Sequence, residues 1–204
     1  MCIRDRLLLA VGDYDRTVRL WDPATGAPAG EPLTHELSVT SVAFGTSLHG
    51  RPLLASGSSD GTVRVWDPAI SAPAGEPLTG HTSWVTSVAF GTGRDGRPLL
   101  ASGSDDGTVR VWDPATSAPV GEPLTGHTGP VGSVTFAAAP DGRLLVASGS
   151  SDRTVRVWDP ATAACTTTLR RRSSVHSVAA AGPWLAIGED DGISVIELDE
   201  LPAR

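Results

Sequence analysis

Three residue types that serine hydrolases combine in their catalytic site recur together in this chain. In such enzymes a serine attacks the substrate, a histidine accepts the serine proton, and an aspartate orients the histidine. Here the same three types occur in three copies, in the same order and at the same spacing. The copies are His35, Ser56 and Asp60; His81, Ser102 and Asp106; and His127, Ser148 and Asp152.

The repetition argues against catalysis. A hydrolase needs one exposed serine beside an oxyanion hole, whereas three equivalent copies favour a structural role. A tryptophan accompanies each copy, at Trp66, Trp112 and Trp158, and its indole N–H is a donor that needs an acceptor. We therefore predict three structural hydrogen-bond networks, no catalytic residue and no enzyme activity. Each serine belongs to a Ser-Gly-Ser triplet; we favour the first serine, and the sequence leaves that choice open.

A repeated hairpin must position these residues. The stretch Leu99–Pro114, LLASGSDDGTVRVWDP, recurs almost unchanged at Leu53–Pro68 and Leu145–Pro160. Each copy is a run of small and aliphatic residues, an Asp-Gly or Asp-Arg turn, and then alternating Thr-Val-Arg-Val-Trp, a pattern typical of two strands joined by a tight turn. A single hairpin is marginally stable in water, so the copies must pack against one another.

The repeat has a fixed frame. Trp-Asp pairs begin at Trp21, Trp66, Trp112 and Trp158, and Gly-His pairs precede two of them at Gly80 and Gly126. With these motifs and a period of about 45 residues, the chain resembles the WD40-repeat family. The resemblance implies an all-β fold, a β-propeller of four-stranded blades whose strands are lettered a to d from the centre outward. It also implies that each His–Ser–Asp–Trp set ties the loop before strand a to strands b and c.

The frame predicts an incomplete propeller. Residues 1–6 fit nothing in the repeat and are interpreted as a truncated or non-native leader. The remaining divisions are a partial blade of strands b to d at 7–34, full blades at 35–79, 80–125 and 126–169, and a degenerate partial blade of strands a to c at 170–204. Three full and two partial blades predict an open arc. We interpret the chain as the C-terminal fragment of a larger protein, and its missing N-terminal blades are then expected as partners.

The outer strands are expected just before each histidine loop. The predicted positions for strand d are 31–34, 76–79, 122–125 and 165–169. The stretches 23–30, 68–75 and 114–121 are rich in Pro, Ala and Gly and are interpreted as turns between strands c and d.

Composition excludes several function classes. The net charge is −7 and the pI is about 5.1, which disfavours nucleic acid as a partner. No apolar run is long enough to span a membrane. Two cysteines give no disulfide framework, so a cytoplasmic location fits. All sixteen basic residues are Arg, a bias typical of a GC-rich, bacterial coding sequence.

No cofactor or metal is expected. The loop Gly91–Gly96 matches a dinucleotide-binding pattern, but it joins two strands and no helix follows to receive a phosphate. His49 and His176 lack metal-ligand spacing. The single basic cluster, Arg170–Arg172, is interpreted as a solvated loop that pairs with the acidic residues 189–191, and a phosphate or acidic-partner contact is the alternative.

Four residues are candidates for binding a partner. In this family the loops before strand a and the b–c turns share one rim, called the top, which is the usual contact face. Differences between the repeats on that rim point to Trp84, Tyr14, Asp105 and Arg153. Aromatic residues and Arg are enriched in binding hot spots. The alternative for Trp84 is that it packs on its own blade.

The sequence therefore predicts a non-catalytic scaffold for protein–protein interaction, with a protein or peptide bound on the top rim. The alternative is a propeller enzyme or carbohydrate-binding propeller with a site in the central channel. Such a site needs convergent titratable side chains, yet the innermost strands read VTSVAF, VTSVAF and VGSVTF.

Overall fold

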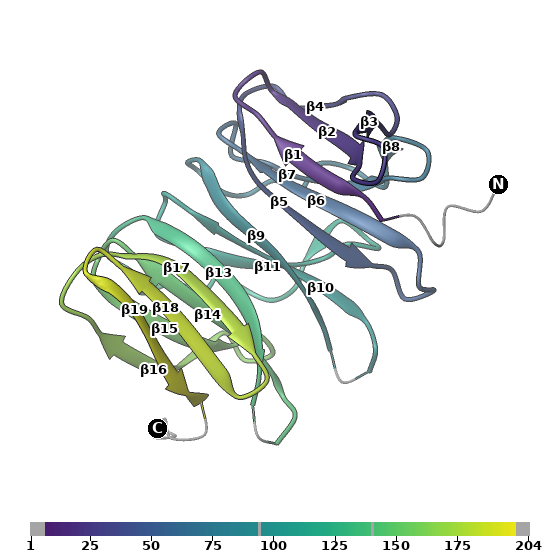
Figure 1. Cartoon of the computed structure of the whole chain (residues 1–204). Helices are drawn as coiled ribbons and strands as arrows, with labels where there is room; N and C mark the ends of the chain where they lie inside the picture. Colours follow the sequence, from purple (N-terminus) through teal and green to yellow (C-terminus); the bar gives the residue numbers. More distant parts are fainter. Residues whose placement is uncertain (1–6, 94, 140, 199–204) are drawn as a thin grey trace.

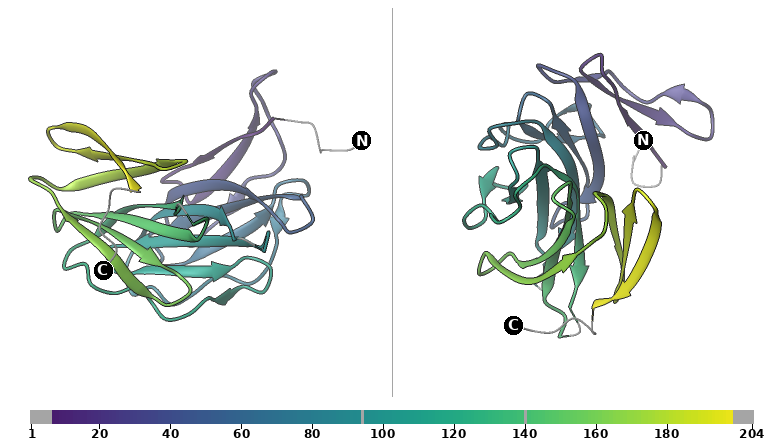
Figure 2. Two further views of the ribbon diagram at one scale, coloured as in Figure 1. Left: turned by 90° about the horizontal axis from the view of Figure 1, so that it is seen from below. Right: turned by 90° about the vertical axis from the view of Figure 1, so that its left-hand side faces the viewer.

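The chain folds into five antiparallel sheets that follow one another along an arc (Figure 1). A computed structural model describes residues 7–93, 95–139 and 141–198. The proposed leader at 1–6 and the last part of the fifth unit, 199–204, lie outside the described residues. Figure 2 shows that the arc is open between the purple first sheet and the yellow fifth sheet. We name the sheets blades 1 to 5 in chain order.

Each blade is built from strands that are consecutive in the sequence. Blade 1 contains β1 (Leu9–Gly12), β2 (Thr17–Asp22), β3 (Ala27–Pro28) and β4 (Leu33–Thr34). Blade 2 contains β5 (Val39–Thr46), β6 (Pro52–Ser58), β7 (Val63–Asp67) and β8 (Ala72–Pro73). Blade 3 contains β9 (Val85–Thr92), β10 (Pro98–Ser104), β11 (Val109–Asp113) and β12 (Ala118–Pro119). Blade 4 contains β13 (Val131–Ala138), β14 (Leu144–Ser150), β15 (Thr154–Asp159) and β16 (Ala164–Arg170). Blade 5 contains β17 (Val175–Ala181), β18 (Trp184–Glu189) and β19 (Gly192–Glu197).

The outer strand differs from the sequence prediction in blades 1 to 3. The stretches interpreted as turns contain the two-residue strands β3, β8 and β12, which pair with the Trp-Asp of the preceding strand. Pairing resumes at Leu33, Leu78 and Leu124, the last two through single bridges. Each intervening segment is Gly-Glu-Pro, where proline removes a ladder donor. Blade 4 has Thr residues there and forms the uninterrupted strand β16.

The hydrophobic core lies between blades. One cluster combines Val63 and Val65 of blade 2 with Val85, Leu100 and Trp112 of blade 3, and the other clusters are built in the same way. No blade therefore buries its apolar face without a neighbour. This stacking is typical of repeat architectures.

Hydroxyl groups link the inner strands. The Thr86 hydroxyl on β9 donates to the Val131 carbonyl at the start of β13, and Ser87 Oγ accepts the Val134 N–H at 3.1 Å. Thr40 and Ser41 of β5 make the same contacts to β9. The Thr-Ser pair of the innermost strands is thus used to join neighbouring blades.

Candidate functional site

The hairpin of each full blade brings three of the four network residues together. In blade 3, Ser102 on β10 lies beside Trp112 on β11, because Leu100 pairs with Trp112 and Ser102 with Arg110. Asp106 sits in the turn between these strands, where Gly107 adopts a left-handed φ of 78°. His81 comes from the loop that precedes β9. The site is therefore formed where the loop to the inner strand crosses the hairpin.

The hydrogen bonds of this network run in one direction. Trp112 Nε1 donates to Ser102 Oγ at 2.8 Å, and Ser102 Oγ lies 2.8 Å from His81 Nε2. His81 Nδ1 lies 2.9 Å from Asp106 Oδ2. Because the indole can only donate, Ser102 Oγ accepts its N–H, and the serine hydroxyl donates to His81 Nε2. The neutral imidazole then donates its Nδ1–H to the carboxylate of Asp106. Every buried polar atom of the four side chains is then satisfied.

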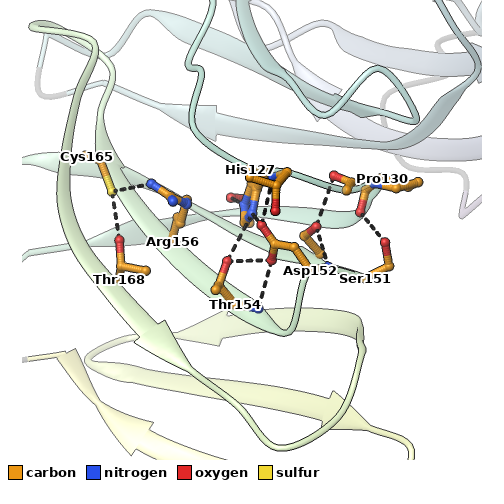
Figure 3. A network of polar contacts seen from close by, with 12 residues as sticks. His127, Pro130, Ser151, Asp152, Thr154, Arg156, Cys165 and Thr168 are labelled. Carbon is orange, nitrogen blue, oxygen red and sulfur yellow. Dashed lines mark hydrogen bonds and ion pairs between the residues drawn. The ribbon is translucent and has the colours of Figure 1, made fainter.

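Blade 4 repeats this geometry. His127 lies 2.8 Å from Ser148 and 2.9 Å from Asp152, and Trp158 donates to Ser148 at 2.8 Å. Figure 3 shows the His127 side chain beside Asp152 and Thr154. In both blades the first serine of the Ser-Gly-Ser triplet contacts His and Trp. The second serine instead accepts the aspartate N–H, as Ser104 does for Asp106 at 3.1 Å.

Blade 2 departs from the pattern. His35 Nε2 lies 2.6 Å from Ser56 Oγ, and Trp66 donates to that oxygen at 2.7 Å. His35 Nδ1, however, lies 3.5 Å from Asp60 Oδ2 and has no hydrogen-bond partner among the described residues. Thr34 precedes this histidine, whereas Gly80 and Gly126, with φ of 146° and 144°, precede the others. Blade 2 therefore lacks the left-handed backbone that precedes the histidine in blades 3 and 4.

Burial keeps the three histidines neutral. Desolvation lowers the pKa of His35, His81 and His127 below 6.5, although the neighbouring aspartate opposes this effect in each case. Desolvation on its own would raise the pKa of Asp106 and Asp152. Hydrogen bonds from the threonine hydroxyl two residues on and from backbone N–H groups outweigh it and lower both pKa values to about 2.

The strand c arginines pack over this network. Arg110 and Arg156 place their guanidinium carbons 5.9 and 5.7 Å from the ring centres of Trp112 and Trp158. A Cβ at Gly80 or Gly126 would lie 2.7 Å from the guanidinium, which would have to shift, and the positive φ of both residues also favours glycine there. Arg156 also donates to Cys165 Sγ at 3.7 Å, as Figure 3 shows.

The geometry does not expose a nucleophile. Ser56, Ser102 and Ser148 have no exposed surface, and each serine oxygen already contacts a histidine and a tryptophan. A substrate carbonyl could not approach that oxygen without removal of the indole. The arrangement can therefore fix loops and strands in place, and as it stands it offers no serine to a substrate.

Blade 5 replaces the network with an ion pair. Arg171, in the position of the histidine, donates from Nε to Glu189 Oε2 at 3.0 Å and from Nη2 to Ser194 Oγ at 2.5 Å. Its neighbours His176 and Asp190 form an exposed pair at 2.5 Å. Within the cluster Arg170–Arg172, the middle arginine is thus engaged with its own blade.

The rim candidates lie on loops at one end of the blades. Tyr14 and Asp105 occupy b–c turns, and Trp84 precedes β9, where its carbonyl accepts the Asp105 N–H at 2.9 Å. Tyr14 is 89% exposed and Trp84 56% exposed, so most of the Trp84 surface faces solvent. Arg153 adopts a left-handed φ of 65° in the turn between β14 and β15.

Sequence reasoning missed Leu37 on the same rim. Leu37 is 50% exposed, and its neighbour Ser38 donates from Oγ to the Tyr14 carbonyl at 3.1 Å. A comparison of the repeats could have identified Leu37, because the other full blades have the small residues Ser83 and Gly129 at this position. We define the top-rim patch as Tyr14, Leu37 and Trp84, which come from blades 1, 2 and 3.

The described residues contain neither a metal-ligand cluster nor a membrane-spanning helix. No group of three or more His, Cys, Asp or Glu side chains in residues 7–93, 95–139 and 141–198 could hold a metal ion. In the same part of the chain, no helix is sufficiently long and apolar to cross a membrane.

Successive antiparallel sheets, inner strands that adjoin from blade to blade and a repeated His–Ser–Asp–Trp network define a propeller-type repeat protein. The family model described as WD domain, G-beta repeat matches residues 2–22, 30–67, 75–113 and 118–159. The chain belongs to the WD40 family, as its repeats predicted. The match ends at residue 159, so β16 to β19 lie beyond it. No curated protein matches the chain.

Proposed function

We propose that this chain is a non-catalytic scaffold that binds a protein or peptide through its top rim. WD40 repeats generally serve as protein-interaction scaffolds, and the family is typically non-catalytic. The observation that carries the proposal is the top-rim patch, which places exposed Tyr14, Leu37 and Trp84 on three successive blades. Asp105 and Arg153 extend the proposed surface along the same rim.

Rigidity of the rim supports this proposal. The loops before β9 and β13 are each tied to the underlying hairpin through a histidine, and the Thr82 and Thr128 N–H groups donate to the same aspartates at 3.0 Å. A partner would therefore meet side chains whose backbone is already ordered. Binding to an ordered surface avoids part of the entropic cost of association.

The central-channel alternative lacks a supporting observation. The Thr and Ser hydroxyls of the inner strands bond to the next blade, as Thr86 and Ser87 do toward β13. A cytoplasmic location forms part of the proposal, because the free thiol of Cys165 suits a reducing compartment.

A peptide selection tests the proposed function. A random peptide library displayed on phage is selected against the full chain, and the binders are then measured against Trp84→Ser, which introduces the residue found at Ser38. We expect affinity to fall at least about tenfold. The matched control is Trp184→Ser, since Trp184 is 47% exposed but lies at the opposite end of blade 5. Binders that tolerate Trp84→Ser, or the absence of any binder, would contradict the proposal.

A further inference from the structure

Blade 2 differs from its neighbours in the loop between its first two strands. Blades 3 and 4 carry an aspartate two residues before an arginine, and these pair: Arg97 Nε with Asp95 at 3.4 Å, and Arg143 Nε with Asp141 at 2.6 Å. In blade 2 the aspartate is replaced by His49. The guanidinium of Arg51 forms no ion pair or hydrogen bond with any side chain in the described part of the molecule.

The same blade differs in the turn after its third strand. Blades 1, 3 and 4 have a threonine in this turn, at Thr25, Thr116 and Thr162, whereas blade 2 has Ile70. Ile70 is 71% exposed. An isoleucine in a solvent-facing turn position where the other copies have threonine is not required by the fold.

These differences converge on one pocket. Strands a and c of a blade end on the same side, so the two segments meet at the bottom rim, opposite the top-rim patch. The pocket has a volume of about 350 Å³, and Leu48, Ile70 and buried Leu53 line it from blade 2. Pro98 and Pro114 of blade 3 contribute to its lining. Its size and apolar lining fall within the range typical of ligand sites, ~300–1,000 Å³.

Charged groups lie on the same lining. Arg51 and His49 face the pocket from the loop, and Asp67 faces it from the end of β7. Asp67 Oδ1 already accepts the Ala69 N–H at 2.9 Å, which fixes the turn that carries Ile70. In blade 4 the equivalent Asp159 pairs with Arg143 at 3.0 Å, but no such pair joins Asp67 to Arg51 among the described residues. The unpaired guanidinium therefore remains available to an incoming carboxylate.

We propose that this blade 2 pocket binds a short segment of a partner protein that presents an aliphatic side chain next to an Asp or Glu. The aliphatic group lies against Leu48, Leu53 and Ile70, and the carboxylate pairs with Arg51. The blade 2 pocket is separate from the top-rim patch, so it supplies a second, independent contact on the opposite rim. It does not depend on the proposed top-rim function.

The experiment uses fluorescent nine-residue peptides and the full chain. The probe peptides carry one central Leu or Ile flanked by Glu, and the comparison peptides carry Lys in place of Glu. Polarisation should increase with the acidic peptides and not with the Lys peptides. Ile70→Thr should weaken binding at least about tenfold, because most of the aliphatic contact is lost. His49→Asp should weaken it as well, since the new carboxylate would pair with Arg51 as Asp95 pairs with Arg97.

Both variants carry residues that other blades already have at these positions, so the fold tolerates them. Thr162→Ile, the same reverse change in blade 4, which contributes nothing to this pocket, is the matched control and should not alter binding. The proposal is overturned if no acidic peptide binds, if the Lys peptides bind equally well, or if Ile70→Thr has no effect. Loss of binding in Trp84→Ser would assign the peptide to the top rim instead. Self-association that Ile70→Thr abolishes would identify a second copy as the occupant and also overturn it.

Discussion

In each His–Ser–Asp–Trp network, buried polar side chains hydrogen-bond the loop before the inner strand to the hairpin beneath it. In blades 3 and 4 the Ser–His–Asp hydrogen bonds have the order of a hydrolase triad, but the serine is buried and its oxygen also accepts the indole N–H. Removal of one member leaves its partners buried without a hydrogen bond, which costs more than the bond itself contributes. The energetic effect of a substitution should therefore depend on how many bonds that member makes.

The three histidines should differ in their effect on stability. His81→Ala removes contacts to Ser102 and Asp106, and we expect the free energy of unfolding to fall by about 1–3 kcal/mol. His35→Ala should cost less, because His35 Nδ1 has no bonded partner among the described residues. Chemical denaturation of both variants measures the difference. An equal or larger loss for His35→Ala would show that the Asp60 contact is closer than 3.5 Å in solution.

The networks also predict how stability depends on pH. The histidine pKa values are lower in the folded chain than the ordinary 6.5, so the unfolded chain binds more protons as the pH falls below 6.5. Stability is therefore lost below pH 6.5. For Asp106 and Asp152 the folded pKa is about 2 against 3.8, so a second loss occurs between pH 3.8 and 2.

Melting temperatures recorded between pH 8 and about pH 2 check this dependence. His81→Gln removes one buried imidazole and should reduce the slope between pH 6.5 and 5. A melting temperature that rises from pH 7 to pH 5 would contradict the assignment of neutral histidines.

At the scale of elements, the sequence predicted the hairpins and the outer strand of blade 4 well and the outer strands of blades 1 to 3 poorly. Strands b and c alternate clearly and end at defined turns, so β10 and β11 lie where Leu99–Trp112 predicted them. In blades 1 to 3 the segment Gly-Glu-Pro divides the outer strand. Strands of two residues, such as β12, are too short to show the alternating pattern by which a strand is predicted from sequence. The sequence predicted the top-rim patch only in part, because leucine is not a residue type enriched in binding hot spots, although Leu37 differs from Ser83 and Gly129 at the same repeat position.

Close contact between inner strands depends on glycine at equivalent positions of β5 and β9, Gly45 and Gly91. A Cβ at Gly91 of β9 would lie 2.4 Å from Cγ of Phe136 in the next blade. Gly91→Ala should therefore displace that ring and lower the free energy of unfolding by about 1–3 kcal/mol. Gly93→Ala is the control, since its nearest neighbour is the mobile carboxylate of Asp95. Thermal melting compares the two, and an unchanged Gly91→Ala protein would contradict the tight contact.

At the scale of the whole molecule, the described part of the arc has an unpaired strand edge in its first and its last blade. Among residues 7–93, 95–139 and 141–198, β1 of blade 1 pairs with β2 alone, and β19 of blade 5 pairs with β18 alone. The side chains there are apolar and exposed: Leu9 is 53% exposed and Ile193 81% exposed. Unpaired edges with apolar side chains recruit further strands, which natural sheets prevent with charged residues. The bonds between interior blades have no counterpart at these two ends.

We therefore expect the full chain to self-associate as its concentration rises. Leu9→Lys combined with Ile193→Lys should reduce association, because a charge at an edge opposes strand addition. Thr116→Lys adds the same charge in an exposed turn away from both edges and should have no effect. Light scattering after size-exclusion chromatography measures the mass at concentrations on the order of 100 µM. A single species of monomer mass at that concentration would show that the edges are protected, and association that persists in the double variant would locate the contact elsewhere.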